Sequence, residues 1–210
     1  MPIKPQDLRL YLVMGSQDCP HHDPAEVLRA AIAGGITMFQ FREKHSVLNL
    51  SETVQLGKTL RSLCRSHRIP FLVNDRVDLA MILEADGVHL GQDDLPVPEV
   101  RRILPPSSLV GVSARNIAEA KQAMQEGADY LGVGPMFATT SKPDARKPIG
   151  PSALAEIRQA IGTFPIVGIG GITCQNGAAV FQAGADGIAV ISAITRADSP
   201  ELSARQLREL

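Results

Sequence analysis

The chain has 210 residues and a mass of 22.5 kDa, near the size of one domain, so it can bury a sizeable apolar core. Its 21 Lys and Arg residues against 22 Asp and Glu residues leave a net charge of −1, which excludes a whole-chain basic field for nucleic acid or anionic lipid. No apolar run approaches the length of about 18 residues that a membrane-spanning helix needs.

The amino-terminal residues and the cysteines predict a cytoplasmic location. Residues 1–9 carry charges where a signal peptide has its apolar stretch. The three cysteines, Cys19, Cys64 and Cys174, are an odd number and lie far apart without a Cys-x-x-Cys pair. They therefore indicate reduced thiols that act as small packing residues, not a disulfide framework or a zinc site.

Short apolar runs rich in Val and Ile recur along the chain and predict strands. The runs lie at residues 10–13, 36–39, 70–73, 87–90, 109–112, 130–133, 165–168 and 188–191. Because both alternating positions are apolar, these segments are typical of strands that are covered on both faces. A parallel sheet with crossover helices requires such strands.

Segments of helical periodicity separate these runs. Asp23 before Pro24 is typical of a helix start, and Gly34 followed by Gly35 is typical of a helix end. Further helices are predicted at residues 51–67, 76–84, 97–104, 117–125, 152–161, 175–183 and from 201 onward.

One phrase recurs where a helix gives way to a strand: a small residue, a polar or flexible turn, and then a buried run. It begins at Gly34, Ala85, Ala128 and Ala185. Repetition of this unit through a chain of this length predicts an α/β fold, a single-domain (β/α)8 TIM barrel over residues 1–210. A doubly wound open sheet is the alternative.

Polar residues follow nearly every predicted strand, which is the functional end of such a barrel. Gly168, Gly170 and Gly171 would let backbone N–H groups approach a ligand, and Ser192 follows the eighth strand. Because the loops after strands seven and eight usually cradle phosphate in these barrels, the pair predicts a phosphate site. The glycines alone would also fit a tight turn.

Two carboxylates and three cations predict a diphosphate site opposite this cradle. Asp75 and Asp94 stand at neighbouring strand ends, as hard oxygen ligands for Mg²⁺ would. Arg42, Lys44 and Lys142 add fixed positive charge. Each Asp alone would equally fit a helix cap or a surface salt bridge, whereas the joint placement favours diphosphate.

Two other sets of residues favour structural roles. His89 lies within a buried run, so a hydrogen-bonded core histidine is favoured over an acid–base catalyst. The Arg101–Arg102 pair, Arg205 and Arg208 are expected on solvated helix faces.

A series of motifs in chain order resembles the thiamine phosphate synthase family. The motifs are residues 35–44, 73–80, 85–94, 111–113, 129–135, 139–142, 165–172 and 191–194. Each motif is modest alone, but jointly they are specific and cover nearly the whole chain. The resemblance implies a β/α barrel that joins a pyrimidine methyl diphosphate to a thiazole ethyl phosphate, giving thiamine phosphate and diphosphate. It also implies Mg²⁺-assisted departure of diphosphate, followed by attack of the thiazole nitrogen on a pyrimidine methylene cation.

The resemblance assigns site residues position by position. For the pyrimidine diphosphate it implies Gln40, Arg42, Lys44, Asn74, Ser113 and Lys142. For the thiazole phosphate it implies Thr139, Ser141, Gly171, Ile191 and Ser192. The neighbouring Phe41, Glu43 and Thr140 complete the implied substrate-binding set, and Asp75 and Asp94 are the implied Mg²⁺ ligands. Arg42, Lys44, Ser113 and Lys142 are the implied catalytic residues.

Two positions depart from the family pattern. Ser141 stands where a second Thr is usual, and Arg115 stands where many relatives carry His. A related thiazole tautomerase uses a His in that loop and tends to lose the Asn-Asp pair that is kept here as Asn74-Asp75. Both features favour the synthase over the tautomerase, and a non-catalytic thiamine phosphate binder is the other alternative.

The expected partners are these small-molecule substrates, with neither nucleic acid nor membrane. A homo-oligomer is possible. The sequence does not distinguish an apolar helix face that packs on the barrel from one that packs on a second copy of the chain.

Overall fold

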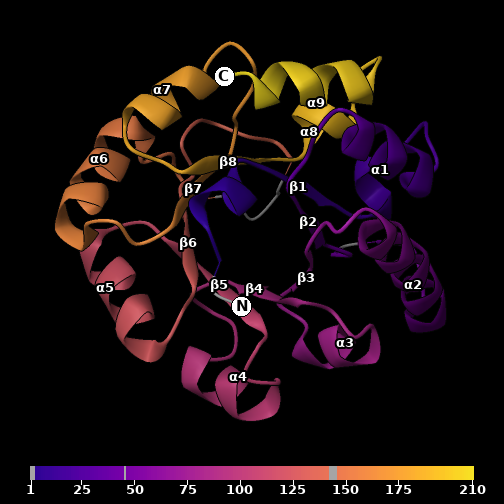
Figure 1. Cartoon of the computed structure of the whole chain (residues 1–210), viewed down its shortest axis with the longest axis horizontal. Helices are drawn as coiled ribbons and strands as arrows, with labels where there is room; N and C mark the ends of the chain where they lie inside the picture. The colour runs from indigo at the N-terminus through magenta and orange to yellow at the C-terminus, as the bar shows by residue number, and fades with distance from the viewer. Residues whose placement is uncertain (1–2, 45, 142–145) are drawn as a thin grey trace.

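The computed structural model describes residues 3–44, 46–141 and 146–210. In this part of the chain, eight parallel strands close into a barrel in sequence order, and the helices form a ring around it (Figure 1). The strands are β1 Leu10–Met14, β2 Met38–Phe41, β3 Phe71–Asn74, β4 Gly87–Leu90, β5 Leu109–Ala114, β6 Tyr130–Val133, β7 Ile166–Ile169 and β8 Gly187–Val190. The predicted barrel is confirmed, and the open sheet is excluded because β1 pairs with β8.

The helices match the predicted segments to within two residues. They are α1 Pro24–Ala33, α2 Leu50–Ser66, α3 Val77–Ile82, α4 Val97–Ile103, α5 Ile117–Glu126, α6 Gly150–Ile161, α7 Gly177–Gln182 and α9 Pro200–Arg208. The sequence did not predict the four-residue helix α8 Ser192–Thr195 or the 3-10 helices η1 Pro5–Leu8 and η2 Ser16–Asp18. Among the described helices, none combines the length and the apolar composition needed to cross a membrane.

Each strand is buried on two sides, which explains why the runs are apolar at most positions of both faces. Alternate residues such as Leu10 and Leu12 belong to the large cluster between barrel and helices, and Tyr11 and Val13 belong to the cluster inside the barrel. Leu8 of η1 joins the inner cluster at the amino-terminal end of the barrel. The expected packing role of the cysteines is confirmed for Cys19 and Cys64, which are free and buried; Cys174 is free and partly buried.

Strand β2 begins two residues later than predicted. Gly35 has φ +97°, and the backbone N–H and the hydroxyl of Thr37 both donate to the Leu10 carbonyl, so these residues turn the chain before the strand starts. In consequence Gln40 and Phe41 lie inside the strand, where their side chains take opposite faces.

The recurring phrase fixes the amino-terminal end of the barrel. The side chains of Thr37, Asp86, Asp129 and Asp186, at the starts of the even-numbered strands, accept from backbone N–H groups of the preceding odd-numbered strands. Each Asp also pairs with an arginine of a helix, and the pairs are Arg61–Asp86, Arg101–Asp129 and Arg158–Asp186. The phrase is therefore a structural device that links sheet and helix.

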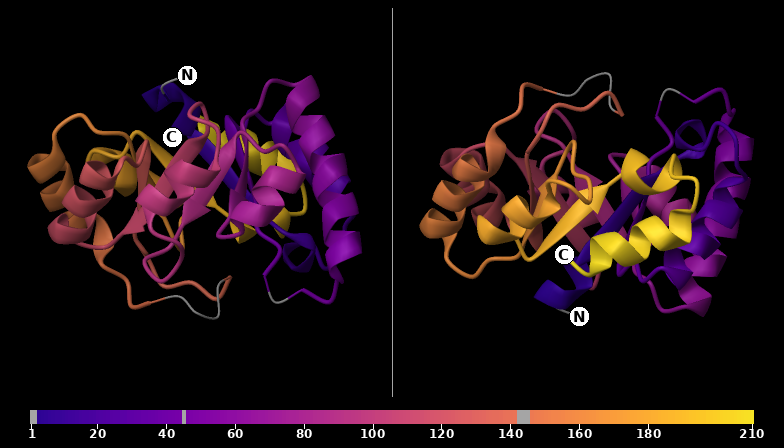
Figure 2. Two further views of the ribbon diagram at one scale, coloured as in Figure 1. Left: turned by 90° about the horizontal axis from the view of Figure 1, so that it is seen from below. Right: turned by 90° about the horizontal axis from the view of Figure 1, so that it is seen from above.

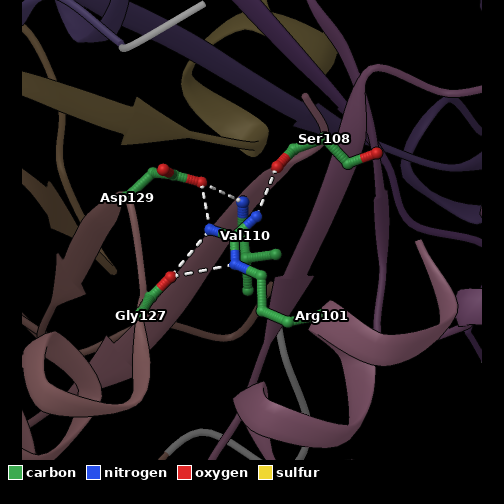
Figure 3. Close-up of polar contacts among 5 residues, drawn as sticks. All are labelled: Arg101, Ser108, Val110, Gly127 and Asp129. Carbon is green, nitrogen blue, oxygen red and sulfur yellow. Dashed lines mark hydrogen bonds and ion pairs between the residues drawn. The ribbon is translucent and has the colours of Figure 1, made fainter. Parts of the chain in front are cut away.

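Arg101 corrects the expectation of a solvated helix face. Its guanidinium donates to the carbonyls of Gly127 and Ser108 and to Asp129, which also accepts from the backbone N–H of Val110 (Figure 3). All of these acceptors lie outside α4, so the guanidinium links the helix to other segments of the chain. Arg102 does lie on an exposed helix face, where it pairs with Glu99.

Candidate functional site

The predicted site residues gather at the carboxyl ends of the strands. Figure 2 shows the described parts of the β2–α2 and β6–α6 connections at one end of the barrel and η1 at the other. Two adjoining cavities open at the loop end, and His89, Pro135 and Ile169 line both. The sequence predicted two ligand positions on opposite sides of this end of the barrel, whereas the two cavities observed there adjoin each other.

The first, which we call the cradle cavity, has a volume of about 410 Å³. Residues of three loops line it: Thr139, Thr140, Ser141, Gly170, Gly171, Ile191 and Ser192. It thus brings together all the residues that the sequence assigned to the thiazole phosphate.

Backbone geometry explains the glycine in this cradle. Gly171 has φ +67°, and a Cβ there would lie 2.5 Å from the carbonyl oxygen of Ala138. Asn176 donates to the Gly171 carbonyl at 3.0 Å, whereas the backbone N–H of Gly171 meets no acceptor in the described part of the chain. Ser141 Oγ donates to Ser192 Oγ at 3.0 Å, which joins the β6–α6 loop to the start of α8. Hydroxyls and a backbone N–H in this arrangement suit a phosphate group.

The second, which we call the charged cavity, has a volume of about 210 Å³. Its lining includes these predicted residues: Arg42, Lys44, Asn74, Asp75, Asp94 and Ser113. Arg42 is 3% exposed, so its side chain is itself largely shielded from water. A buried cation strengthens the attraction of an anionic ligand.

The carboxylates of the charged cavity interact with each other and with a lysine. Lys44 Nζ lies 3.2 Å from Asp75 Oδ2, and Asp94 accepts from the backbone N–H of Gly91 at 2.6 Å. Burial and the neighbouring Asp75 raise the pKa of the Asp94 carboxyl above its usual value. Two acids placed this close repel when both are ionised, so a cation between them would lower the electrostatic energy.

This donor set fits Mg²⁺. Asp75 and Asp94 are hard oxygen donors lining one cavity, and the described residues include no cluster of three or more His, Cys, Asp or Glu side chains that could hold a metal. Mg²⁺ often binds through one or two carboxylates and keeps water or phosphate oxygens as its other ligands. The chemistry of this pair is compatible with such a site.

Two predicted site residues, Phe41 and Glu43, lie outside both cavities, and Gln40, expected at the pyrimidine diphosphate, lines the cradle cavity. Phe41 is 1% exposed and belongs to the layer between barrel and helices, where its ring stacks on Phe71 with centroids 6.1 Å apart. Glu43 lines neither cavity, because its carboxylate accepts from the backbone N–H and the hydroxyl of Ser16. Lys142 lies outside the described residues.

The structure adds lining residues that the sequence did not assign. Tyr11 lies in the cradle cavity, and Arg115 and Arg146 lie in the charged cavity. Arg115 donates to the Lys147 carbonyl at 3.2 Å, and its buried Nε has no hydrogen-bond partner among the described residues. The departure noted at Arg115 thus adds a cation to this cavity. The only feature of the sequence that could have identified Tyr11 is its hydroxyl group within an otherwise apolar predicted strand.

His89 is hydrogen-bonded within the core, as predicted. It is 6% exposed, and its two ring nitrogens bond to Tyr130 and Ser113. It also separates the two cavities, so a structural residue contributes to the shape of both.

The fold is a parallel barrel with two adjoining cavities at the carboxyl ends of its strands, one lined by glycines and hydroxyls and the other by charged side chains. These features are typical of TIM-barrel enzymes that act on phosphorylated small molecules. Sequence comparison narrows this class, since the profile described as thiamine monophosphate synthase matches residues 10–194. The chain belongs to this family.

Individual relatives agree with this membership. A thiamine-phosphate synthase of Chloroflexus aurantiacus is 51% identical over 204 residues, which cover 97% of this chain and 93% of the relative. Another, from Bacillus cereus, is 50% identical over 203 residues, or 96% and 92% of the two chains.

Solved structures extend the comparison. The thiamine phosphate pyrophosphorylase of Pyrococcus furiosus superposes with a TM-score of 0.87 at 38% identity, over 98% of this chain and 96% of that one. The 3-hexulose-6-phosphate synthase of Salmonella typhimurium superposes with a TM-score of 0.71 at 18% identity, over 96% and 97%, and shares the fold alone.

Proposed function

We propose that this enzyme joins a pyrimidine methyl diphosphate to a thiazole ethyl phosphate, with thiamine phosphate and diphosphate as products. The observation that carries the proposal is the pair of adjoining cavities, one lined by glycines and hydroxyls and the other by charged side chains. The first suits a phosphate and the second a more highly charged anion. Their common wall of His89, Pro135 and Ile169 would bring the reacting ends of the two substrates together.

The charged cavity would hold the diphosphate. Arg42, Lys44 and Arg115 supply positive charge, and Asp75 and Asp94 would hold Mg²⁺. When bound, Mg²⁺ would neutralise charge on the diphosphate oxygens. The sequence resemblance adds Lys142 to these cations.

The reaction then needs no general base from the protein. The bond between the pyrimidine methylene carbon and the diphosphate oxygen breaks, and the electron pair leaves with the diphosphate. The lone pair of the thiazole nitrogen forms the new bond to that carbon, so the positive charge passes to the thiazolium ring without loss of a proton. This chain's part is to bind the leaving group and hold the two rings in line.

Two sequence features favour this reaction over the related tautomerisation. Asn74 and Asp75 remain at the end of β3, and Arg115 occupies the position where we expect the tautomerase to carry its proton-transferring histidine. We also propose a cytoplasmic location, which agrees with the free thiols of Cys19 and Cys64.

The direct test supplies the purified enzyme with both substrates and Mg²⁺ and follows thiamine phosphate, with EDTA in a parallel sample. We expect product in the first sample and almost none in the second. Conversion of the thiazole precursor alone, without diphosphate or metal, would identify a tautomerase. Tight binding of thiamine phosphate by a folded protein that turns over neither substrate would identify a binder.

A further inference from the structure

A buried chain of hydrogen bonds runs through the barrel interior from one cavity to the other. Gln40 Nε2 donates to Tyr11 Oη at 2.7 Å, and Tyr11 Oη lies 3.0 Å from Tyr130 Oη. Tyr130 Oη lies 2.9 Å from His89 Nδ1, and His89 Nε2 lies 3.0 Å from Ser113 Oγ. The chain thus links Gln40 in the cradle cavity with Ser113 in the charged cavity.

Neighbouring residues make room for this chain. Tyr11 and Tyr130 are the only two tyrosines of the sequence, and they are 1% and 0% exposed. A Cβ at Gly111 would lie 2.1 Å from the ring of Tyr130, and a Cβ at Gly132 would lie 2.8 Å from the ring of His89. Glycine inside a strand often marks such a close approach.

The direction of each hydrogen bond follows from the supply of hydrogens. The amide nitrogen of Gln40 can only donate, so Tyr11 accepts there. Tyr130 is the one other hydrogen-bond partner of Tyr11 Oη among the described residues, so the buried hydroxyl hydrogen of Tyr11 is satisfied by donation to Tyr130. Tyr130 must then donate to His89 Nδ1, which therefore carries no hydrogen. Burial raises the pKa of both tyrosines, so each keeps its hydrogen.

We infer that Tyr11 and Tyr130 are positioning residues that hold His89 as the neutral Nε2–H tautomer, so that Ser113 must donate its hydroxyl hydrogen into the charged cavity. His89 Nε2 donates to Ser113 Oγ, and Ser113 Oγ has no other partner among the described residues. Its hydrogen is then directed to an anion. The inference rests on the proposed function at one point, which is the identification of the anion as the leaving diphosphate.

Nitrogen-15 NMR of enzyme labelled at histidine tests the tautomer without any substrate. The chain has five histidines, and His89→Asn assigns the relevant signals by their loss. We expect Nδ1 of His89 without a proton and Nε2 with one. A proton on Nδ1 would overturn the inference, because it would mean that the chain runs the other way, from Ser113 to the amide oxygen of Gln40.

Kinetics of Tyr130→Phe test the consequence for Ser113. This variant removes one oxygen, and we expect kcat to fall about five- to tenfold with little change in KM, because loss of a single buried hydrogen bond has effects of this size. In an enzyme that already carries Ser113→Ala, Tyr130→Phe should lower kcat almost no further, because Tyr130 acts on the reaction through His89 and the Ser113 hydroxyl. Tyr11→Phe breaks the chain one bond earlier and should act in the same direction.

Thr53→Val is the matched control, because it deletes a hydroxyl from a residue of α2 that is 8% exposed and lies outside both cavities. An equal loss in the control, or full additivity of Tyr130→Phe with Ser113→Ala, would contradict the positioning role. If the native enzyme formed no thiamine phosphate, the NMR result would still decide the tautomer, so the two proposals fail separately.

Discussion

Substitution of Asp129 by Ala should destabilise the fold through a single carboxylate oxygen at the amino-terminal end of the barrel. Asp129 Oδ2 accepts from the backbone N–H of Val110 at 2.7 Å and from Arg101 at 2.6 Å (Figure 3). Val110 is 0% exposed, so its N–H would be left without an acceptor, at a cost of about 1–3 kcal/mol. The partly exposed ion pair adds about 0.5–1 kcal/mol after allowance for solvent screening.

Urea denaturation of Asp129→Ala should therefore show a loss of about 2–3 kcal/mol in the free energy of unfolding, with an unchanged m-value. Asp129→Asn retains an oxygen for Val110 and should lose about 1 kcal/mol. Turnover below the unfolding transition should be unchanged, because this end of the barrel is remote from the cavities.

The pair between Glu99 and Arg102 gives the matched control, since their side chains are 53% and 77% exposed. Glu99→Ala should lose no more than about 0.5 kcal/mol. If Asp129→Ala were as mild as this control, the inference that the carboxylate satisfies a buried N–H would be refuted.

Three further substitutions address the site and the core. Asp75→Asn should reduce Mg²⁺-dependent turnover by about 100-fold or more while the unfolding midpoint stays near normal, because Asn tolerates the φ of +59° at this position; near-normal turnover would remove the assigned metal role. Ser141→Ala should raise the KM for the thiazole phosphate several-fold by deleting the hydroxyl that donates to Ser192, and an unchanged KM would speak against the cradle. Gly187→Ala would place a Cβ 1.7 Å from the Leu8 carbonyl oxygen and should lower the free energy of unfolding by about 1–3 kcal/mol, measured in urea.

Residues next to strand ends were predictable because the chain itself places them there. Asn74 and Asp75 come directly after a buried run, and Thr139 to Ser141 follow another. Once the strands are parallel, all their carboxyl ends meet at one end of the barrel. Side chains within a strand were harder to place, since a run that is buried on both faces gives no sign of which face points inward.

Gln40, Phe41 and Arg101 show where that limit lies. The turn at Gly35 delays β2 by two residues, so the strand extends to Gln40 and Phe41. Gln40 bonds to Tyr11 inside the barrel, and Phe41 packs toward the helices. Arg101 looked like a surface residue because Asp129, its partner, lies 28 positions further along the chain.

The sequence by itself determined the alternation of strands and helices, the parallel barrel and the loops that carry the site, because these depend on local periodicity and turn chemistry. Only the tertiary structure decided that Tyr11 meets Tyr130, 119 residues away, and that His89 and Ser113 continue the same hydrogen-bond chain. The physical reason is that such contacts depend on barrel closure and on the stagger between strands. Both are set by packing of the whole interior and not by neighbours in the sequence.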